Sequence, residues 1–164
     1  RDAIALERRR HDERLCGREL ARERCVVDFA EERRSFVGDR SNRRIQVFDT
    51  EGKFLRMFTI DVPPDPKTRA VNGNTPSGQA LARLVGAPNS ICITPGPNQV
   101  MFVGETYPGR IFKVSLDGKV LGVIGSSGRQ LKQFSGAHAL ACPSDKEIYA
   151  AETSNWRVQK LILK

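Results

Sequence analysis

The stretch FVGDRSNRRIQVFDTEGKFLRMF, residues 36–58, decides the fold because the chain repeats it. It aligns without a gap with FVGETYPGRIFKVSLDGKVLGVI, residues 102–124, and its first part aligns with YAAETSNWRVQKLIL, residues 149–163. In each copy an acid is followed five residues later by Arg, and a β-branched residue follows the Arg. This spacing predicts a hairpin in which the acid ends one strand, the Arg begins the next, and the two form an ion pair across the turn. The predicted structural pairs are Asp39 with Arg44, Glu105 with Arg110, and Glu152 with Arg157.

The first two copies contain a second hairpin signal, DTEGK at residues 49–53 and SLDGK at residues 115–119. Glycine there supplies the positive φ that a tight turn needs. Each unit therefore contains about four short strands in roughly 40 to 50 residues, which is the size of a propeller blade. A helix is predicted only around residues 77–85. We predict an all-β chain, a partial β-propeller of about three four-stranded antiparallel blades.

Composition divides the chain into two parts. Residues 1–44 contain 13 Arg and no Lys, and residues 1–25 lack Pro, which favours a helix. We expect residues 1–34 to form an Arg-rich, helical or poorly ordered segment, although residues 26–29 could supply another strand of the first blade. Residues 35–164 are expected to form the blades. Their Pro/Gly-rich insert at residues 61–86 is predicted to be an interblade loop outside the sheet stack.

The overall composition excludes several classes of protein. The 164 residues carry a net charge of +8 and are 39% hydrophobic, which is typical of a globular protein. No stretch approaches the roughly 18 apolar residues of a transmembrane helix, so we expect no membrane span. The four cysteines are too few for a disulfide scaffold and wrongly spaced for a zinc ribbon. Cys92 and Cys142 fall in predicted inner strands and are interpreted as small buried residues.

Two segments resemble a known repeat family. DRSNRRIQVFDTEGKFL, residues 39–55, resembles the NHL-repeat signature, and IGSSGRQLKQFSGAHALA, residues 124–141, resembles the lead-in to another NHL blade. The resemblance covers about residues 35–164 and implies a six-bladed β-propeller. With three blade signatures, the chain is expected to be part of a larger propeller or to close a 3+3 ring as a homodimer, and we favour the first. The resemblance also suggests an extracytoplasmic location, periplasmic or secreted.

The NHL family is similar to peptidyl-α-hydroxyglycine α-amidating lyase, a zinc-containing propeller enzyme. The resemblance makes His138 a candidate metal ligand, because histidines at this blade position hold the metal in that enzyme. The matching position of the middle blade is Asn89, and catalytic zinc generally needs three protein ligands. We therefore expect no cofactor, with zinc or calcium as the alternative. Arg40 and Tyr107 match active-site positions of the lyase and are candidate catalytic residues, Arg40 for a substrate carboxylate and Tyr107 for proton transfer.

The favoured function is a non-catalytic recognition module that binds a small-molecule or protein ligand on its channel face. The candidate ligand-binding residues lie at turns and at the channel mouth: His138, Asn89, Arg40, Tyr107 and Trp156. The first alternative is a metal-dependent lyase of the amidating type. The second alternative is an RNA-binding propeller, in which a basic face contacts phosphates and Tyr107 or Trp156 stacks on bases.

Overall fold

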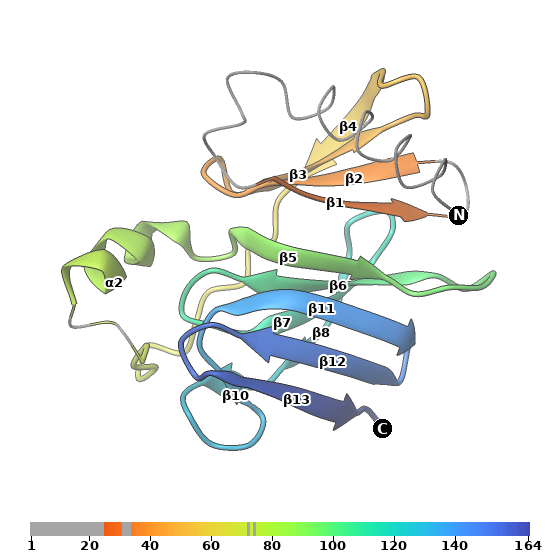
Figure 1. Cartoon of the computed structure of the whole chain (residues 1–164). Coiled ribbons are helices and arrows are strands. Elements are labelled where there is room, and N and C mark those ends of the chain that lie inside the picture. The colour runs from red at the N-terminus through yellow and green to blue at the C-terminus, as the bar shows by residue number, and fades with distance from the viewer. Residues whose placement is uncertain (1–24, 31–33, 72, 74) are drawn as a thin grey trace.

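Three antiparallel sheets follow one another along the chain and stack face to face (Figure 1). The computed structural model describes residues 25–30, 34–71, 73 and 75–164. Blade 1 contains β1 (Cys25–Ala30), β2 (Arg34–Asp39), β3 (Arg44–Phe48) and β4 (Phe54–Phe58). Blade 2 contains β5 (Pro88–Ile93), β6 (Val100–Glu105), β7 (Ile111–Ser115) and β8 (Val120–Ile124). Blade 3 contains β11 (Ala137–Ser144), β12 (Glu147–Glu152) and β13 (Arg157–Ile162).

The sheets are joined by two connections of very different length. Between β4 and β5 lie α2 (Pro76–Leu81) and the 3₁₀ turn η1 (Ala82–Leu84), as the sequence predicts for residues 77–85. Thr75 begins α2, because its hydroxyl accepts a hydrogen bond from the Gly78 backbone N–H at 3.0 Å. Between β8 and β11 lie the short strands β9 (Ser126–Ser127) and β10 (Gln133–Phe134), which pair in parallel. The first strands of the blades are neighbours, since β1 and β11 both contact β5.

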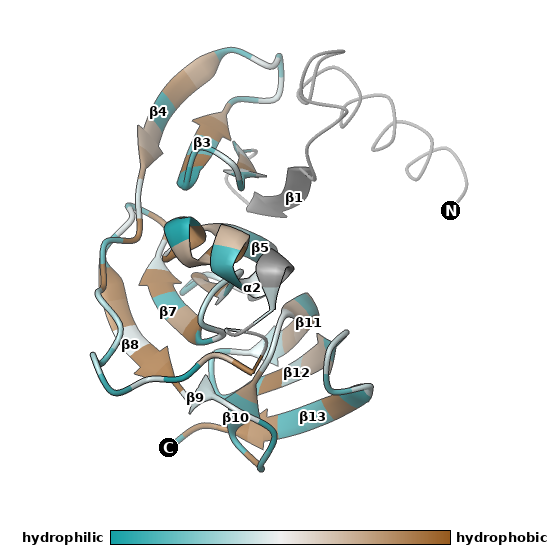
Figure 2. Ribbon diagram, turned by 90° about the vertical axis from the view of Figure 1, so that its left-hand side faces the viewer, coloured by the Kyte–Doolittle hydropathy of each residue, from teal (hydrophilic) through white to brown (hydrophobic). Residues whose placement is uncertain are grey.

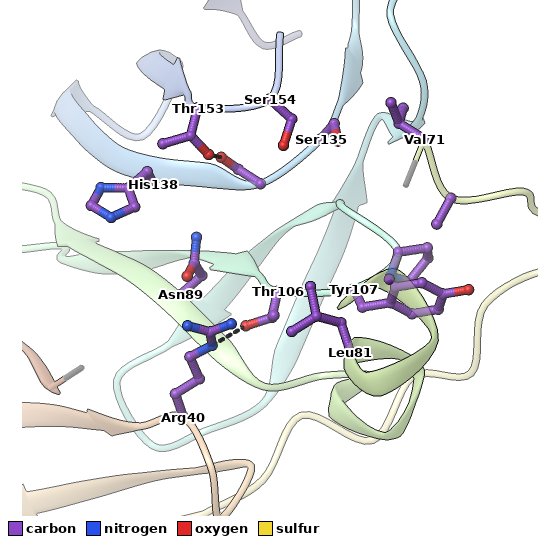
Figure 3. Close-up of a pocket in the computed structure, with 14 residues that line it drawn as sticks. Arg40, Val71, Leu81, Asn89, Thr106, Tyr107, Ser135, His138, Thr153 and Ser154 are labelled. Carbon is purple, nitrogen blue, oxygen red and sulfur yellow. Dashed lines mark hydrogen bonds between the residues drawn. The ribbon is translucent and has the colours of Figure 1, made fainter. Parts of the chain in front are cut away.

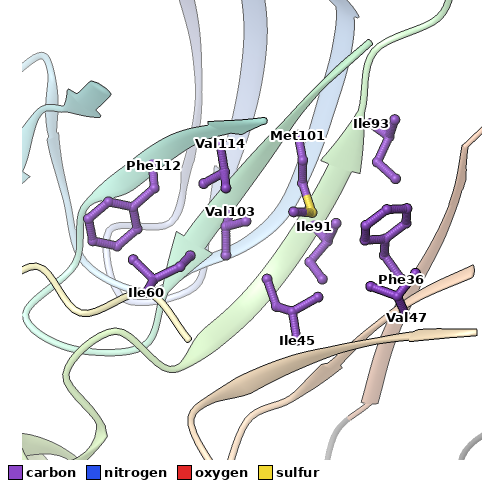
Figure 4. Close-up of a cluster of buried hydrophobic side chains, with 10 residues drawn as sticks. All are labelled: Phe36, Ile45, Val47, Ile60, Ile91, Ile93, Met101, Val103, Phe112 and Val114. Atoms are coloured by element: carbon purple, nitrogen blue, oxygen red, sulfur yellow. The ribbon is translucent and has the colours of Figure 1, made fainter. Parts of the chain in front are cut away.

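Two apolar cores lie between the blades, and they explain why the middle blade is apolar on both faces. Along β6, the side chains of Met101 and Val103 pack toward blade 1, whereas the side chain of Phe102 packs toward blade 3. All three are fully buried. The core between blades 1 and 2 is shown in Figure 4. A continuous apolar run in a strand therefore marks a sheet that is covered on both sides.

The cysteine interpretation is wrong: Cys92 and Cys142 form a disulfide, with their Cα atoms 6.0 Å apart. Cys92 lies on β5 opposite Phe102, and both cysteines pack in the core between blades 2 and 3. The bond thus joins the first strands of two neighbouring blades. Spacing alone could not predict it, because the two residues are 50 positions apart and meet only when the blades stack.

The ends of the repeat array differ in detail from the predicted architecture. The region of residues 26–29 is part of β1, which pairs along its whole length with β2, so blade 1 begins before residue 35. Blade 3 has three strands in the described part of the chain, where about four are predicted. The predicted helix over residues 1–25 falls almost entirely outside the described residues. None of the helices in the described part of the chain has the length and apolar character to cross a membrane.

Candidate functional site

The three acid-to-Arg turns lie on one face of the sheet stack, which we call the turn face. It is the left side of Figure 1 and faces the viewer in Figure 2, where α2 lies in front of the blades. All three predicted ion pairs are present in these turns. The distance from Arg Nε to the carboxylate oxygen is 2.8 Å for Arg44 with Asp39, 2.5 Å for Arg110 with Glu105, and 2.7 Å for Arg157 with Glu152.

In blades 2 and 3, the ion pair also holds the connection that precedes the blade. The Arg110 guanidinium donates hydrogen bonds to the backbone carbonyls of Val62 (2.8 Å) and Pro63 (3.2 Å), where the insert begins. The Glu105 carboxylate accepts a hydrogen bond from the Gly86 backbone N–H (3.2 Å), where the insert ends. Burial raises the pKa of the Glu105 carboxyl above its ordinary value, and the hydrogen bonds from Arg110 and Gly86 oppose that rise.

The same arrangement recurs in blade 3, although its connection is much shorter. The Arg157 guanidinium donates to the carbonyls of Arg129, Gln130 and Gln133, and the Glu152 carboxylate accepts from the Ser135 backbone N–H. In both blades the acid–Arg pair therefore fixes the preceding connection: in blade 2 it holds both ends of the insert, and in blade 3 it holds the middle and the last residues of the shorter connection.

A pocket of about 120 Å³ opens on the turn face (Figure 3). All three blades and the insert contribute to its wall. Four of the five candidate ligand-binding residues line it: Arg40, Asn89, Tyr107 and His138. The remaining lining residues are Ala70, Val71, Gly78, Leu81, Thr106, Pro108, Ser135, Gly136, Thr153 and Ser154.

Asn89 and His138 occupy equivalent positions, and each lies at an irregularity of its strand. The register between β5 and β6 shifts between Pro88 and Ser90, so Asn89 is the extra residue. The register between β11 and β12 shifts between Ala137 and Ala139, so His138 is the extra residue. A β-bulge redirects the side chain of the inserted residue. The same local device therefore directs both side chains into the pocket.

Hydrogen bonds between blades fix the polar end of this pocket. The Arg40 Nε of blade 1 donates to the Thr106 hydroxyl of blade 2 at 3.1 Å. The Asn89 amide of blade 2 donates to the Ala137 carbonyl of blade 3 at 3.0 Å. Because each bond crosses a blade boundary, the positions of Arg40 and Asn89 depend on how the blades stack.

The opposite end of the pocket is apolar and owes this character to the insert. In Figure 3, Leu81 of the insert lies between Thr106 and Tyr107, and Val71 lies on the side of the pocket away from Arg40, Asn89 and His138. The insert is thus a wall of the pocket, and the prediction of a loop outside the sheet stack is incomplete. Ile60, immediately before the insert, is buried in the core between blades 1 and 2.

Trp156 does not line the pocket. It lies in the same turn as Thr153 and Ser154, which do, and its side chain is 93% exposed. Its backbone has a φ of 51°, and the equivalent residues Arg43 and Gly109 have φ values of 56° and 108°. The turn thus imposes a left-handed conformation that favours glycine. A bulky Trp there presents a large aromatic surface to solvent, two residues after the lining residue Ser154.

The described residues do not fit a resident metal ion. No three His, Cys, Asp or Glu side chains come together in the described ranges in a way that could hold one. His138 has Asn89 as its counterpart in blade 2, and the carboxylates nearest in sequence to the pocket, Glu105 and Glu152, are bonded to arginines. We therefore derive no chemical step through zinc or calcium.

The repeat itself could have revealed the lining residues that the sequence analysis missed. Arg40, Thr106 and Thr153 each follow the acid of the motif directly, and all three line the pocket. The residue that directly follows the acid of the motif therefore lines the pocket in every blade. No such repeat signal marks Val71 and Leu81, because the insert that contains them occurs only once in the sequence.

Comparison with solved structures supports the architecture. The chain resembles hydrazine synthase from Kuenenia stuttgartiensis, a propeller-type fold, with a TM-score of 0.56 at 10% identity, over 84% of this chain and 32% of that one. The chain is a partial β-propeller. A catalytically inactive virginiamycin B lyase from Staphylococcus aureus with quinupristin aligns at a TM-score of 0.47 and 15% identity, over 85% of this propeller chain and 41% of the lyase.

The propeller chain thus spans less than half the length of either structure. No protein-family model matches it, and no curated protein matches it either. Membership of the NHL-repeat family stays a prediction.

Proposed function

We propose that this propeller is a binding module, and that its turn-face pocket takes a small ligand with an anionic group and a short apolar group. One observation carries the proposal: Arg40 and His138 line the pocket together with hydroxyl and amide groups, and none of the described residues that line it is Asp or Glu. The planar fork of donors on a guanidinium suits a carboxylate or another small anion.

The dimensions of the pocket limit what can enter it. At about 120 Å³ it is smaller than the roughly 300–1,000 Å³ that is typical of pockets for drug-sized ligands. It accommodates only the head of a ligand, which we define as its anionic group and its short apolar group. The anionic group would lie next to Arg40 and the apolar group between Leu81 and Tyr107. Trp156, in the same turn as the lining residues Thr153 and Ser154, offers an exposed aromatic surface for whatever extends beyond the head, including the chain of a protein ligand.

The test is an NMR titration of the full chain with three small probes: acetate, isovalerate and the neutral amide of isovalerate. We expect isovalerate to shift the backbone amides of Thr106, His138 and Thr153. We expect acetate to bind more weakly, because it lacks the apolar group. The neutral amide should cause no saturable shift, because it matches isovalerate in shape and lacks the charge.

Two variants assign the effect to the two ends of the pocket. Arg40→Gln should abolish the response to isovalerate, whereas Arg83→Gln, the same change at an exposed arginine outside the pocket, should leave it unchanged. Leu81→Ala should weaken the binding of isovalerate and leave the binding of acetate unchanged. Equal shifts with acid and amide, or a response unaffected by Arg40→Gln, would refute an anion site.

The two alternative functions make different predictions. A metal-dependent lyase requires stoichiometric zinc or calcium that is lost in His138→Ala. The described residues supply no set of metal ligands around that histidine. RNA binding requires an affinity that falls steeply with salt, because lysines and arginines displace counterions from phosphates. Titration of a single-stranded oligonucleotide at several salt concentrations separates it from binding of a small anion.

We also propose an oxidising, extracytoplasmic compartment for this chain. The Cys92–Cys142 disulfide supports it, since disulfides are rare in reducing compartments. Closure of a 3+3 ring by a homodimer stays a proposal that the molar mass in solution decides.

A further inference from the structure

The first half of the insert, residues 64–71, belongs to no helix or strand and runs outside the sheets (Figure 1). The hydrogen bonds of its backbone are local. The Asp65 carbonyl accepts from the Thr68 N–H at 2.8 Å, and the Ala70 carbonyl accepts from the Gly73 N–H at 2.9 Å. Within the described residues, no hydrogen bond joins this segment to a blade. Local opening of the segment therefore breaks little of the fold.

Arg69 is an exposed basic residue of this segment, and it directly precedes the pocket wall. In the part of the chain that the structure describes, neither its N–H nor its carbonyl takes part in a hydrogen bond. The two residues that follow it, Ala70 and Val71, line the turn-face pocket. Exposed loops are the preferred sites of proteolytic cleavage, and a trypsin-like protease selects a basic side chain on the residue before the cut.

The connection between blades 2 and 3 also contains exposed basic residues, but its backbone is held in the middle. The Arg157 guanidinium donates to the Arg129 carbonyl at 2.6 Å. The Lys132 backbone N–H donates to the Gln159 side-chain oxygen at 3.0 Å. The insert is held only at its ends, so the two connections should differ in their resistance to a protease.

We propose that the bond between Arg69 and Ala70 is a processing site for a trypsin-like protease, and that the cut changes the pocket and leaves the blades assembled. Hydrolysis consumes one water molecule, leaves a carboxylate on Arg69 and leaves an α-amino group on Ala70. The cut divides no blade, because blade 1 lies before it and blades 2 and 3 lie after it.

The two fragments should stay together, because the apolar core between blades 1 and 2 joins them. The clamp also spans the cut, since Val62 and Pro63 belong to the first fragment and Arg110, which binds their carbonyls, belongs to the second. A further bond across the boundary runs from Arg43 Nε to the Val85 carbonyl at 2.8 Å.

The effect on the pocket rests on the proposed function. The new α-amino group of Ala70 is positively charged below a pKa of about 7.7–8.0. It stands next to Val71, which lies on the side of the pocket away from Arg40 (Figure 3). A charge there makes burial of an apolar ligand group less favourable, and the cut also releases Val71 from the preceding chain. The cut should therefore reduce the preference of the pocket for isovalerate over acetate.

The test is limited digestion of the full chain with trypsin, with mass spectrometry to follow each bond after Lys or Arg in residues 34–164. The Arg69–Ala70 bond should be cut about tenfold or more faster than the bonds after Arg129 and Lys132, since cleavage follows the population of locally opened chain. The cut chain should elute from a sizing column as one species. Its NMR titration should show that the advantage of isovalerate over acetate is lost.

Two variants assign the effects to this bond. Arg69→Gln should abolish the fast cut, whereas Arg83→Gln, the same change at an exposed arginine in η1 of the same insert, should leave its rate unchanged. Trypsin-treated Arg69→Gln should also keep the preference for isovalerate, which separates this cut from any other cut.

Three results would overturn the proposal: a first cut elsewhere in residues 34–164, fragments that separate, or an unchanged preference after the cut. An intact chain that binds neither acid would refute the proposed function instead. The order of cleavage and the elution of the cut chain would then still decide whether Arg69–Ala70 is a processing site.

Discussion

Removal of the disulfide between blades 2 and 3 should destabilise the chain substantially. The sequence separation of 50 residues between Cys92 and Cys142 corresponds to a loss of loop-closure entropy of about 14 cal/mol/K, or about 4 kcal/mol at room temperature. The net stability of a domain is about 5 to 15 kcal/mol, so this contribution is a large share of it. The bond acts on the unfolded chain, which can no longer separate the two first strands.

The assay is equilibrium unfolding in urea, followed by far-UV circular dichroism. For a slope of about 2 kcal/mol/M, the loss of about 4 kcal/mol lowers the midpoint by about 2 M. The double variant Cys92→Ala/Cys142→Ala and the reduced wild-type chain should both show this drop. The reduced wild type controls for the change of side chains, since it keeps both sulfur atoms in the core.

Two results would refute the reasoning. If the oxidised and reduced wild-type chains unfold at the same urea concentration, the cross-link does not constrain the unfolded chain. If the double variant is destabilised and the reduced wild type is not, the effect comes from packing in the core between blades 2 and 3.

Three further predictions follow from buried contacts and from one shifted pKa. Arg110→Ala should lower the free energy of unfolding in urea by about 3–5 kcal/mol, because it leaves the fully buried Glu105 carboxylate without its partner. Arg44→Ala should lower it by less, since that arginine side chain is 33% exposed. Equal losses in the two variants would show that burial of the ion pair does not set the cost. Gly104→Ala should destabilise the chain by about 1–3 kcal/mol, since a Cβ there would lie 2.5 Å from the Ser90 hydroxyl and 3.0 Å from the Ala137 carbonyl oxygen. Gly122→Ala, where a Cβ meets nothing within 4 Å, should not destabilise it, and the same midpoint for both variants would contradict this account. Hydrogen bonds from Tyr149 and Lys160 hold the pKa of the Glu147 carboxyl below its ordinary value of 4.5, so the stability that they provide is present above pH 4.5 and is lost as the pH falls. In Tyr149→Phe, an NMR titration should find the pKa of Glu147 closer to 4.5. An unchanged pKa would show that the Tyr149 hydroxyl is not the main cause of the lowered value.

The sequence was sufficient for the architecture because the repeat combines two kinds of information. The acid–Arg spacing specifies a turn, and the apolar runs on either side specify strands, so the last three strands of blade 1 and the four strands of blade 2 are predicted from the sequence. β1 was harder to recognise, because the motif lies after it and its own residues carry no turn signal. The Cys92–Cys142 disulfide was missed for a similar reason, since stacking of the blades decides it and the pattern within one blade does not.

The candidate site was predicted in part. The resemblance to the lyase selected Arg40, Tyr107 and His138, and the repeat supplied Asn89 as the counterpart of His138; these four residues of three blades line one pocket. Trp156 was selected as a turn residue and does not line the pocket, because its side chain is exposed to solvent from a turn with a left-handed backbone. The apolar wall was not predicted, since the path of an insert that occurs once depends on tertiary contacts and not on a period.

The clamp formed by Arg110 and Glu105 has a consequence for protein engineering. It secures the first and last residues of the insert to blade 2 and leaves the residues between them free of that constraint. The clamp of blade 3 differs, because it bonds the middle and the end of a connection less than half as long. The segment between Pro63 and Gly86 is therefore a natural graft site, where a foreign peptide or a small domain can replace the insert while blades 1 and 2 keep their packing. Libraries built at this one position would vary the wall of the pocket and leave its polar end intact.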